Sequence, residues 1–403
     1  MLKQFTTALS KAVSFVSTSI EKIKGLTKPC SKFFTWLFER WWMLPVRYNF
    51  LNLSRYGGYS EKAIREQFKR RFPFPSLFHE VFESLSKKEC IAAFDPSYIP
   101  KSGKKTYGMG RFWSGTDSRM KKGLEVSSLA IIDVADGTAY SLEAVQTPAD
   151  PDNLVEHYAK VITERIEDIL PYTCYVAVDG YFMKEGFIRT MLDLGLQVIT
   201  KGRTDSDMLY LYNGRQHKGK GRKKKFAGKI DWKHIDRRRW KVCYEDEEMI
   251  AYELVVWSKV LGRAVKAVYL WHKVSEGYAI LISTDTELKG ETVLKYYRLR
   301  FQIEFLIRDA KSYTGLEHCQ GRNEVKLYNH FNMALMSVSI IKWLMWAKLP
   351  NKEEVSFSMR SVKTYFMNKF LTQTIFSKLG LELSCKKIKK LFNECLNIGS
   401  MAA

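Results

Sequence analysis

The sequence predicts an α/β protein centred on a mixed five-stranded β-sheet, with helical segments on either side. Two observations lead to this class: short apolar runs alternate with amphipathic stretches, and two of these runs end in an aspartate. The composition agrees, because 46% of the 403 residues are hydrophobic and 27% are charged, values typical of a folded globular chain.

Residues 1–88 are predicted to be helical. Apolar residues recur there at helical spacing, as in Leu9, Val13 and Val16. Ser60 precedes a basic amphipathic stretch and is a good N-cap residue.

From residue 89 the pattern changes to strands. Cys90–Phe94 is a buried-strand pattern that ends at Asp95. Two further runs, 126–134 and 138–146, flank Asp136-Gly137, a strong hairpin signal.

Helices then alternate with strands. An amphipathic helix is expected over 153–170, and a strand over Tyr175–Val178, which ends at Asp179. A helix over 187–194 and a strand over 196–200 follow. Three antiparallel strands followed by two strands joined through helical crossovers give the ribonuclease-H-like topology. Open sheets of this kind place ligand sites at the carboxyl ends of their strands.

The rest of the chain divides into three parts. Residues 204–284 contain five strand-like runs and are predicted to form a β-rich insertion with a basic loop. Residues 285–347 are helical and complete, with 89–203, the catalytic core. Residues 348–403 form a C-terminal helical region.

The net charge of +22 points to a polyanionic partner, either nucleic acid or an anionic membrane surface. The charge is uneven: residues 201–241 hold 15 basic and 4 acidic residues, whereas residues 90–200 hold 11 and 15. A basic periphery around an acidic centre favours an enzyme that grips phosphates and holds cations. No membrane span is expected, because the most apolar stretch, 331–346, is short and contains Lys342. Seven scattered cysteines without a C-x-x-C pair favour reduced thiols in the cytoplasm.

One helix after the insertion carries a polar stripe. At about 100° per residue, Tyr297, Arg300, Glu304 and Lys311 share one narrow face. The apolar residues Phe301, Ile303 and Phe305 point in other directions, so we expect them to pack on the sheet.

This stripe completes a candidate metal site. Glu304 would join Asp95 and Asp179, and oxygen ligands of this kind suit Mg²⁺ or Mn²⁺. Two such ions would activate the nucleophile and stabilise the leaving oxygen of a phosphodiester. Tyr297, Arg300 and Lys311 would hold phosphate oxygens nearby.

The residues resemble the signature of the insertion-sequence-four family of bacterial DDE transposases. Tyr297, Arg300, Glu304 and Lys311 meet the spacing Y-x2-R-x3-E-x6-K without a gap. The blocks around Asp95 and Asp179 resemble that family too, and the resemblance covers roughly residues 88–345.

The resemblance implies Mg²⁺-dependent cleavage at element ends and transfer of the 3′-OH into target DNA by a dimer bound to double-stranded DNA. It implies that residues 1–88 bind the element ends and that residues 348–403 help assembly. Arg308 falls where some relatives carry another phosphate-binding cation, and a bacterial, nucleoid-associated protein is implied.

The basic loop of the insertion is expected to contact DNA, because releasing counterions favours phosphate binding by clustered cations. Its cations are Lys218, Lys220, Arg222, Lys223, Lys224 and Lys225.

Other interpretations stay open at this point. Each aspartate alone is also a common turn former, Tyr297 suits a core, Lys311 and Arg308 suit a solvated helix face, and the loop cations suit a soluble surface. A related nuclease that cuts without joining, and a catalytically silent DNA-binding relic of a transposase, are the alternative functions.

Overall fold

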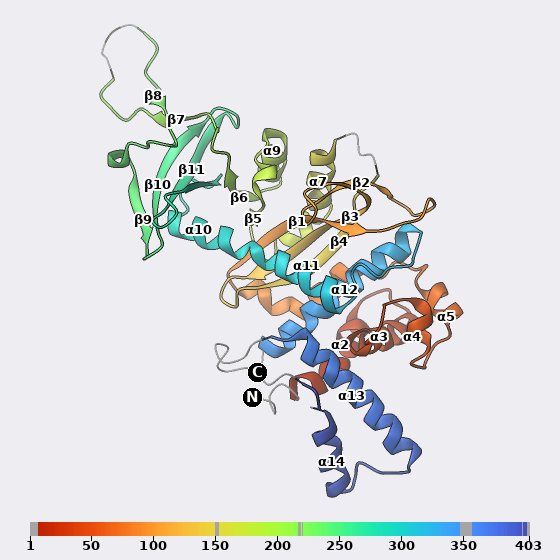
Figure 1. Cartoon of the computed structure of the whole chain (residues 1–403). Helices are drawn as coiled ribbons and strands as arrows, with labels where there is room; N and C mark the ends of the chain where they lie inside the picture. The colour runs from red at the N-terminus through yellow and green to blue at the C-terminus, as the bar shows by residue number, and fades with distance from the viewer. Residues whose placement is uncertain are drawn as a thin grey trace.

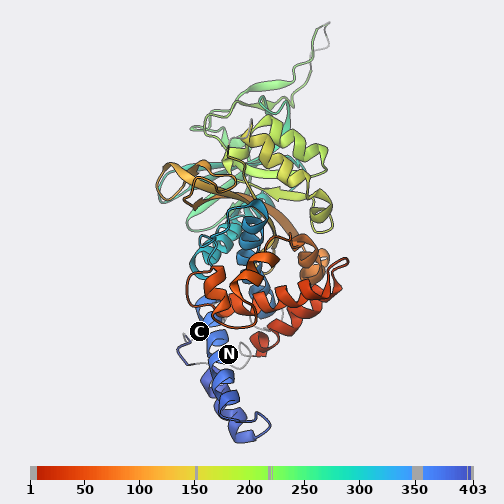
Figure 2. The same ribbon diagram turned by 90° about the vertical axis from the view of Figure 1, so that its right-hand side faces the viewer.

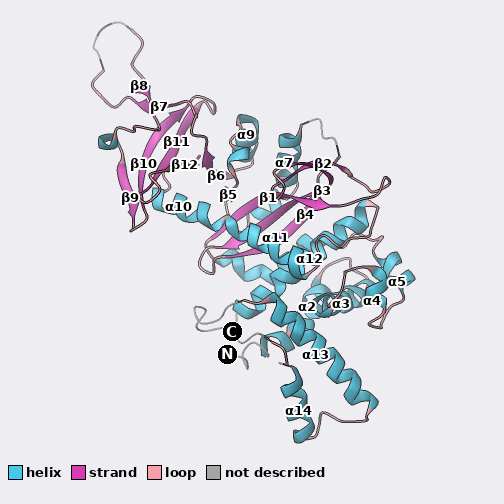
Figure 3. Cartoon of the chain, in the orientation of Figure 1, coloured by secondary structure: helices cyan, strands magenta, loops and turns pink. Residues whose placement is uncertain are grey.

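A single mixed β-sheet runs through most of the molecule (Figure 1), and Figure 3 shows it in magenta between layers of helices. The structure is a computed structural model. It describes residues 7–149, 153–216, 219, 221–346, 357–396 and 398–400. The predicted mixed α/β class is confirmed.

Five strands form the part of the sheet that carries the acidic residues. They lie side by side in the order β4–β3–β1–β5–β6. The β4–β3 and β3–β1 pairs are antiparallel, and the β1–β5 and β5–β6 pairs are parallel, which are the expected directions. The bounds are β1 (Cys90–Pro100), β3 (Arg119–Asp133), β4 (Thr138–Gln146), β5 (Tyr175–Ala177) and β6 (Gln197–Gly202).

The expected number of five strands is wrong, because the described sheet has twelve. β12 pairs antiparallel with β6, so the insertion extends the same sheet, and the backbone groups of the β6 edge gain partners. β2, which pairs antiparallel with the first half of β3, is a strand that the sequence pattern does not predict. The additional strands are β2 (Gly110–Ser114), β7 (Met208–Leu211), β8 (Phe226–Lys229), β9 (Lys241–Glu245), β10 (Met249–Ser258), β11 (Arg263–His272) and β12 (Tyr278–Ser283).

Three helices cover one face of the sheet: α10 (Gly290–Leu299), α11 (Phe301–Tyr313) and α12 (Glu324–Trp346). In Figure 1 the first two run across the strands in cyan. Ile91 and Ala93 of β1 are buried in the hydrophobic cluster on this face. Their neighbours Ala92 and Phe94 are buried in the cluster on the opposite face, as alternating strand residues must be.

The opposite face is covered by α7 (Leu154–Thr163), α9 (Glu185–Asp193) and the N-terminal helices. The indole nitrogens of Trp41 and Trp42 donate to the carbonyls of Thr314 and Ser337, so the N-terminal helices are anchored to the core. Ser60 accepts a hydrogen bond from the Ala63 amide, as its predicted N-cap role requires. These helices are α2 (Ala12–Lys22), α3 (Lys28–Met43), α4 (Phe50–Ser54), α5 (Glu61–Gln67) and α6 (Phe74–Phe82).

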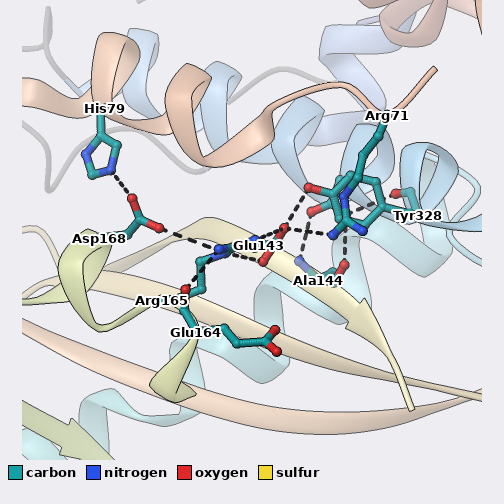
Figure 4. A network of polar contacts seen from close by, with 9 residues as sticks. Arg71, His79, Glu143, Ala144, Glu164, Arg165, Asp168 and Tyr328 are labelled. Atoms are coloured by element: carbon teal, nitrogen blue, oxygen red, sulfur yellow. Dashed lines mark hydrogen bonds and ion pairs between the residues drawn. The ribbon is translucent and has the colours of Figure 1, made fainter. Parts of the chain in front are cut away.

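A buried carboxylate fastens the N-terminal segment to the sheet (Figure 4). Glu143 of β4, whose side chain is 2% exposed, pairs with Arg165 and Arg71. The Tyr328 hydroxyl of α12 donates to it at 2.7 Å. Arg165 also lies 3.9 Å from Asp168, which contacts His79 of α6 at 2.7 Å. The charge of Glu143 is therefore compensated inside the fold.

The molecule is elongated, with the insertion at one end and the C-terminal helices at the other (Figure 2). α13 (Met359–Lys378) packs on α3, and α14 (Lys386–Leu396) packs back on α13. No helix in the described residues is long and apolar enough to cross a membrane.

Candidate active site

Asp95 of β1 and Asp179, which lies two residues beyond the end of β5, have equivalent positions relative to the pairing of these two parallel strands. The β1–β5 register pairs Ala93 with Ala177, and each aspartate follows its alanine by two residues. Because side chains two residues apart lie on the same face, both aspartates belong to the face covered by α10 and α11. Strand neighbours are about 4.8 Å apart, so the two residues are brought close together.

The turn after β5 holds Asp179 in place. Its Oδ1 accepts a hydrogen bond from the Tyr181 amide at 2.8 Å and caps a short 3₁₀ turn, Gly180–Phe182. The Thr200 hydroxyl of β6 donates to the Asp179 carbonyl at 2.7 Å. One oxygen of the carboxylate therefore has a structural role as well.

The helix that carries Glu304 differs from the expected single helix over 296–311. It is divided at Arg300, which ends α10 and begins α11. The Arg300 amide is shared between the carbonyls of Tyr296 and Tyr297, each at 3.2 Å. A shared donor marks a tightened turn, so a constant 100° step does not hold across this point.

Arg300 nevertheless meets Glu304. Its Nη2 atom lies 2.8 Å from Oε1 of Glu304, and the two side chains are 6% and 42% exposed. The Arg300 guanidinium lies 5.5 Å from the ring centre of Tyr297. Its buried Nε has no hydrogen-bond partner among the described residues, so one donor of a buried cation remains unpaired.

The acidic residues lie close enough together for the charges of two of them to affect the pKa of the third. The pKa of Asp95 is raised to about 7, mainly by burial; the charges of Glu304 and Asp179 contribute to this rise, and the charge of Arg300 opposes it. The pKa of Tyr297 is raised by burial, and the charges of Asp179 and Glu304 add to this. Three carboxylates, one guanidinium and one phenol thus act on one another, although they come from three distant parts of the chain.

Carboxylates that repel one another in this way suit a divalent cation, because oxygen ligands and a net negative charge are what Mg²⁺ and Mn²⁺ require. Among the described residues, however, no group of three or more His, Cys, Asp or Glu is gathered closely enough to hold a metal ion. Glu304 is paired with Arg300 instead. The carboxylate oxygens are suitable ligands for such a metal ion. In this structure, however, the Glu304 carboxylate is bound to Arg300 and is not grouped with the two aspartates.

The other sequence-predicted cations lie in different places. Lys311 donates to the Tyr98 carbonyl of β1 at 2.9 Å and lies 3.4 Å from Glu317. Arg308 is exposed, and its guanidinium lies 4.8 Å from the ring centre of Phe305. In the part of the chain that the structure describes, neither Lys311 nor Arg308 forms an ion pair with the candidate ligands Asp95, Asp179 and Glu304; Arg308 instead lies 3.8 Å from Asp309.

The basic loop lies far along the sheet from this site, between β7 and β8 at the end of the strand order. Arg222, Lys223, Lys224 and Lys225 are all exposed. Lys218 and Lys220 lie outside the described residues.

Two apolar residues of α11 are not where the helical pattern places them. Phe301 and Phe305 were expected to pack on the sheet, but they are 43% and 40% exposed, whereas Ile303 is fully buried as expected. Phe301 and Phe305 lie one turn apart on the side of α11 opposite Ile303, and Leu306 and Ala310 are buried on the same side as Ile303.

A fourth carboxylate near Asp95 was missed. Glu125 of β3 is 6% exposed, accepts a hydrogen bond from the Tyr158 hydroxyl at 2.6 Å, and adds its charge to Asp95. Burial raises the pKa of Glu125. The run that predicts this strand begins at residue 126, directly after Glu125, whereas the strand itself begins at Arg119.

The sequence pattern places the end of a strand at Asp95, but β1 continues to Pro100, and Asp95 lies just beyond the last residue pair of the parallel β1–β5 ladder. Asp179 follows the end of β5, and a third acidic residue, Glu304, lies on a covering helix. These features define the class of this protein as an α/β protein with an acidic site where two parallel strands separate. A family model described as "Transposase DDE domain" matches residues 126–340. The chain belongs to this DDE transposase family. The match includes Asp179 and Glu304 and begins after Asp95.

Comparisons with curated proteins and with solved structures add no family assignment. No curated protein matches the chain. A cryo-EM structure of the piggyBac transposase synaptic complex with hairpin DNA is similar, with a TM-score of 0.40 and 13% sequence identity over 98% of this chain and 84% of that one.

Proposed function

We propose that this protein is a transposase that cleaves DNA at the ends of an insertion sequence and joins the freed 3′-OH to target DNA. Membership of the DDE transposase family supports the general activity. The observation that carries the proposal for the site is the register of Ala93 with Ala177, which puts Asp95 and Asp179 at equivalent positions on the face covered by α11. The influence of Asp179 and Glu304 on the pKa of Asp95 is consistent with this arrangement.

In this proposal Asp95, Asp179 and Glu304 would hold two Mg²⁺ or Mn²⁺ ions, which would supply Lewis-acid activation of the nucleophile and of the leaving oxygen. Arg300 binds a phosphate oxygen with its unpaired Nε and releases Glu304 for the metal site. Tyr297, adjacent to Arg300, positions the backbone. Water is the first nucleophile, and the 3′-OH is the second.

We assign the larger parts of the chain accordingly. Residues 89–203 and 285–347 form a ribonuclease-H-like catalytic core, and residues 204–284 present the basic loop to DNA. Residues 1–88 bind the element ends, and residues 348–403 assist a homodimer on DNA. The spacing of Tyr297, Arg300, Glu304 and Lys311 supports the insertion-sequence-four family.

A strand-transfer assay with Mg²⁺, candidate element ends and a supercoiled target tests this function. Joined products support it, whereas nicking without joining identifies a nuclease. The variant Glu304→Gln should lower cleavage by more than about 100-fold, since even the groups that support metal ligands contribute 10–100-fold. End binding should persist; an unfolded or non-binding variant would make Glu304 a structural residue.

A further inference from the structure

A cavity lined by positively charged side chains lies near the C-terminal end of β1, a few residues beyond Asp95. It has a volume of about 780 Å³ and lies where the N-terminal helices, the end of β1 and the segment between α11 and α12 meet. This volume is within the range of ligand-binding clefts. Its lining includes five cations and one carboxylate, Glu317: the cations are Arg47, Arg65, Lys101, Arg322 and Lys326.

Most of this charge lacks a counterion. Glu317 lies 3.4 Å from Lys311, and Arg65 pairs with Glu61 outside the cavity. Among the described residues, no carboxylate is paired with the other four cations of the lining. A cavity that gathers like charges without compensation costs free energy unless an anion fills it.

The cations are held close enough to affect one another. The Lys101 ammonium donates to the Cys319 carbonyl, which fixes it at the cavity wall. Burial lowers the pKa of Lys101, and the charges of Arg47 and Arg322 lower it further. Arg65 and Lys326, which also line the cavity, lie 5.1 Å and 5.9 Å from the ring centre of Phe50, so both are next to the same lining residue.

The cavity is connected to the acidic site through one helix and one strand. Lys311, whose partner Glu317 lines the cavity, is seven residues beyond Glu304, or about 10 Å along a helix. Lys311 also bonds to the Tyr98 carbonyl of β1, three residues after Asp95. Both elements therefore lead from the acidic residues to the cations.

We propose that this cavity, which we call the Arg47–Arg322 pocket, binds phosphate groups of the DNA strand that extends from the acidic site toward the N-terminal helices. Arginines at the mouth grip phosphate oxygens in bidentate fashion, and Lys101 provides charge from the wall. The identification of the phosphate as that of DNA rests on the proposed function, whereas the phosphate chemistry rests on the pocket alone.

The test compares two double variants with equal loss of charge. Arg47→Gln with Arg322→Gln alters the pocket through exposed side chains. Lys160→Gln with Arg189→Gln removes two cations from α7 and α9 whose side chains are each 72% exposed. Affinity for a short duplex of random sequence is measured by fluorescence anisotropy at several salt concentrations.

The pocket variant should flatten the plot of log affinity against log salt by about 0.9 for each lost phosphate contact, and the surface variant should not. A second arm measures thermal stabilisation by inorganic phosphate at constant ionic strength. If only this stabilisation is lost in the pocket variant, the site takes free phosphate.

If neither measurement separates the two variants, the pocket proposal is overturned. If the unaltered protein fails to bind duplex DNA at all, the proposed function fails, and the phosphate arm still decides the pocket.

Discussion

Arg300 and Glu304 form an ion pair one helical turn apart, with the arginine buried and the glutamate half-exposed. The buried partner is fixed by the helix break and by the rings of Tyr297 and Phe301. The exposed partner is free to exchange. Arg300 is therefore the stable part of the proposed site, and Glu304 is the part that can reorganise.

The first prediction concerns the shape of the Arg300 side chain. Arg300→Lys keeps the positive charge but removes the planar fork and its unpaired Nε, so cleavage should fall about 100-fold, as when one preorganised donor is lost. DNA affinity should change little. Arg298→Lys, at an exposed position two residues earlier, is the control in the same cleavage assay. Full activity of Arg300→Lys would show that charge alone suffices.

A second prediction concerns the loop between β7 and β8. Replacing the exposed Lys223, Lys224 and Lys225 by alanine should flatten the salt dependence of DNA affinity, each lost phosphate contact contributing about 0.9 to the slope. Anisotropy titrations measure this, with the Lys160/Arg189 double variant as the control for loss of surface charge. An unchanged slope would assign the loop to solvent.

The buried Glu143 network allows a prediction about stability. Glu143→Gln leaves Arg165 and Arg71 without their carboxylate, so the free energy of unfolding should fall by about 3 kcal/mol, the usual cost of breaking a buried pair. Glu164→Gln, at the neighbouring exposed position in Figure 4, should stay within about 0.5 kcal/mol. Urea denaturation of both variants compares these costs, and equal losses would refute the role of Glu143.

A fourth prediction follows from His330, which is 4% exposed. Burial lowers its pKa to about 3, against the opposing effect of its hydrogen bond with the Gly315 carbonyl. The unfolded chain, with a histidine pKa near 6.5, binds the proton that the folded protein excludes, so stability falls as the pH drops from about 6.5 toward 3.

Between pH 7 and pH 5 this residue should cost about 2 kcal/mol. Urea denaturation at both pH values measures the loss, and His330→Gln should reduce the pH dependence by that amount. If the variant and the unaltered protein lose stability equally, His330 titrates normally in the fold.

The local pattern of the sequence predicts the strands that bear the acidic residues. The continuous apolar run Cys90–Phe94 and the acid that follows each buried run are local properties, and both reappear in the register of Ala93 with Ala177. The joining of β12 to β6 is not predicted in the same way. It depends on which open strand edge lies nearby after folding, and strand-length patterns carry no such information.

In the candidate site, too, some features are predicted by the local sequence and others depend on contacts made only after folding. Residue spacing groups Tyr297, Arg300 and Glu304, and the Arg300 guanidinium lies beside both the Glu304 carboxylate and the Tyr297 ring. Phe301 is exposed because it lies on the side of α11 opposite Ile303, so these two side chains cannot both pack on the sheet. Glu125 was missed because its contribution comes from the strand beside Asp95, not from its own neighbours in sequence.

The union of core and insertion in one sheet has a mechanical consequence. A load applied where β7 and β8 end passes through a continuous ladder of backbone hydrogen bonds to β6. On β6 the load reaches Thr200, whose hydroxyl donates a hydrogen bond to the backbone carbonyl of Asp179. A flexible hinge between core and insertion would not transmit such a force. A continuous hydrogen-bonded sheet transmits it to the backbone segment that carries the Asp179 carboxylate.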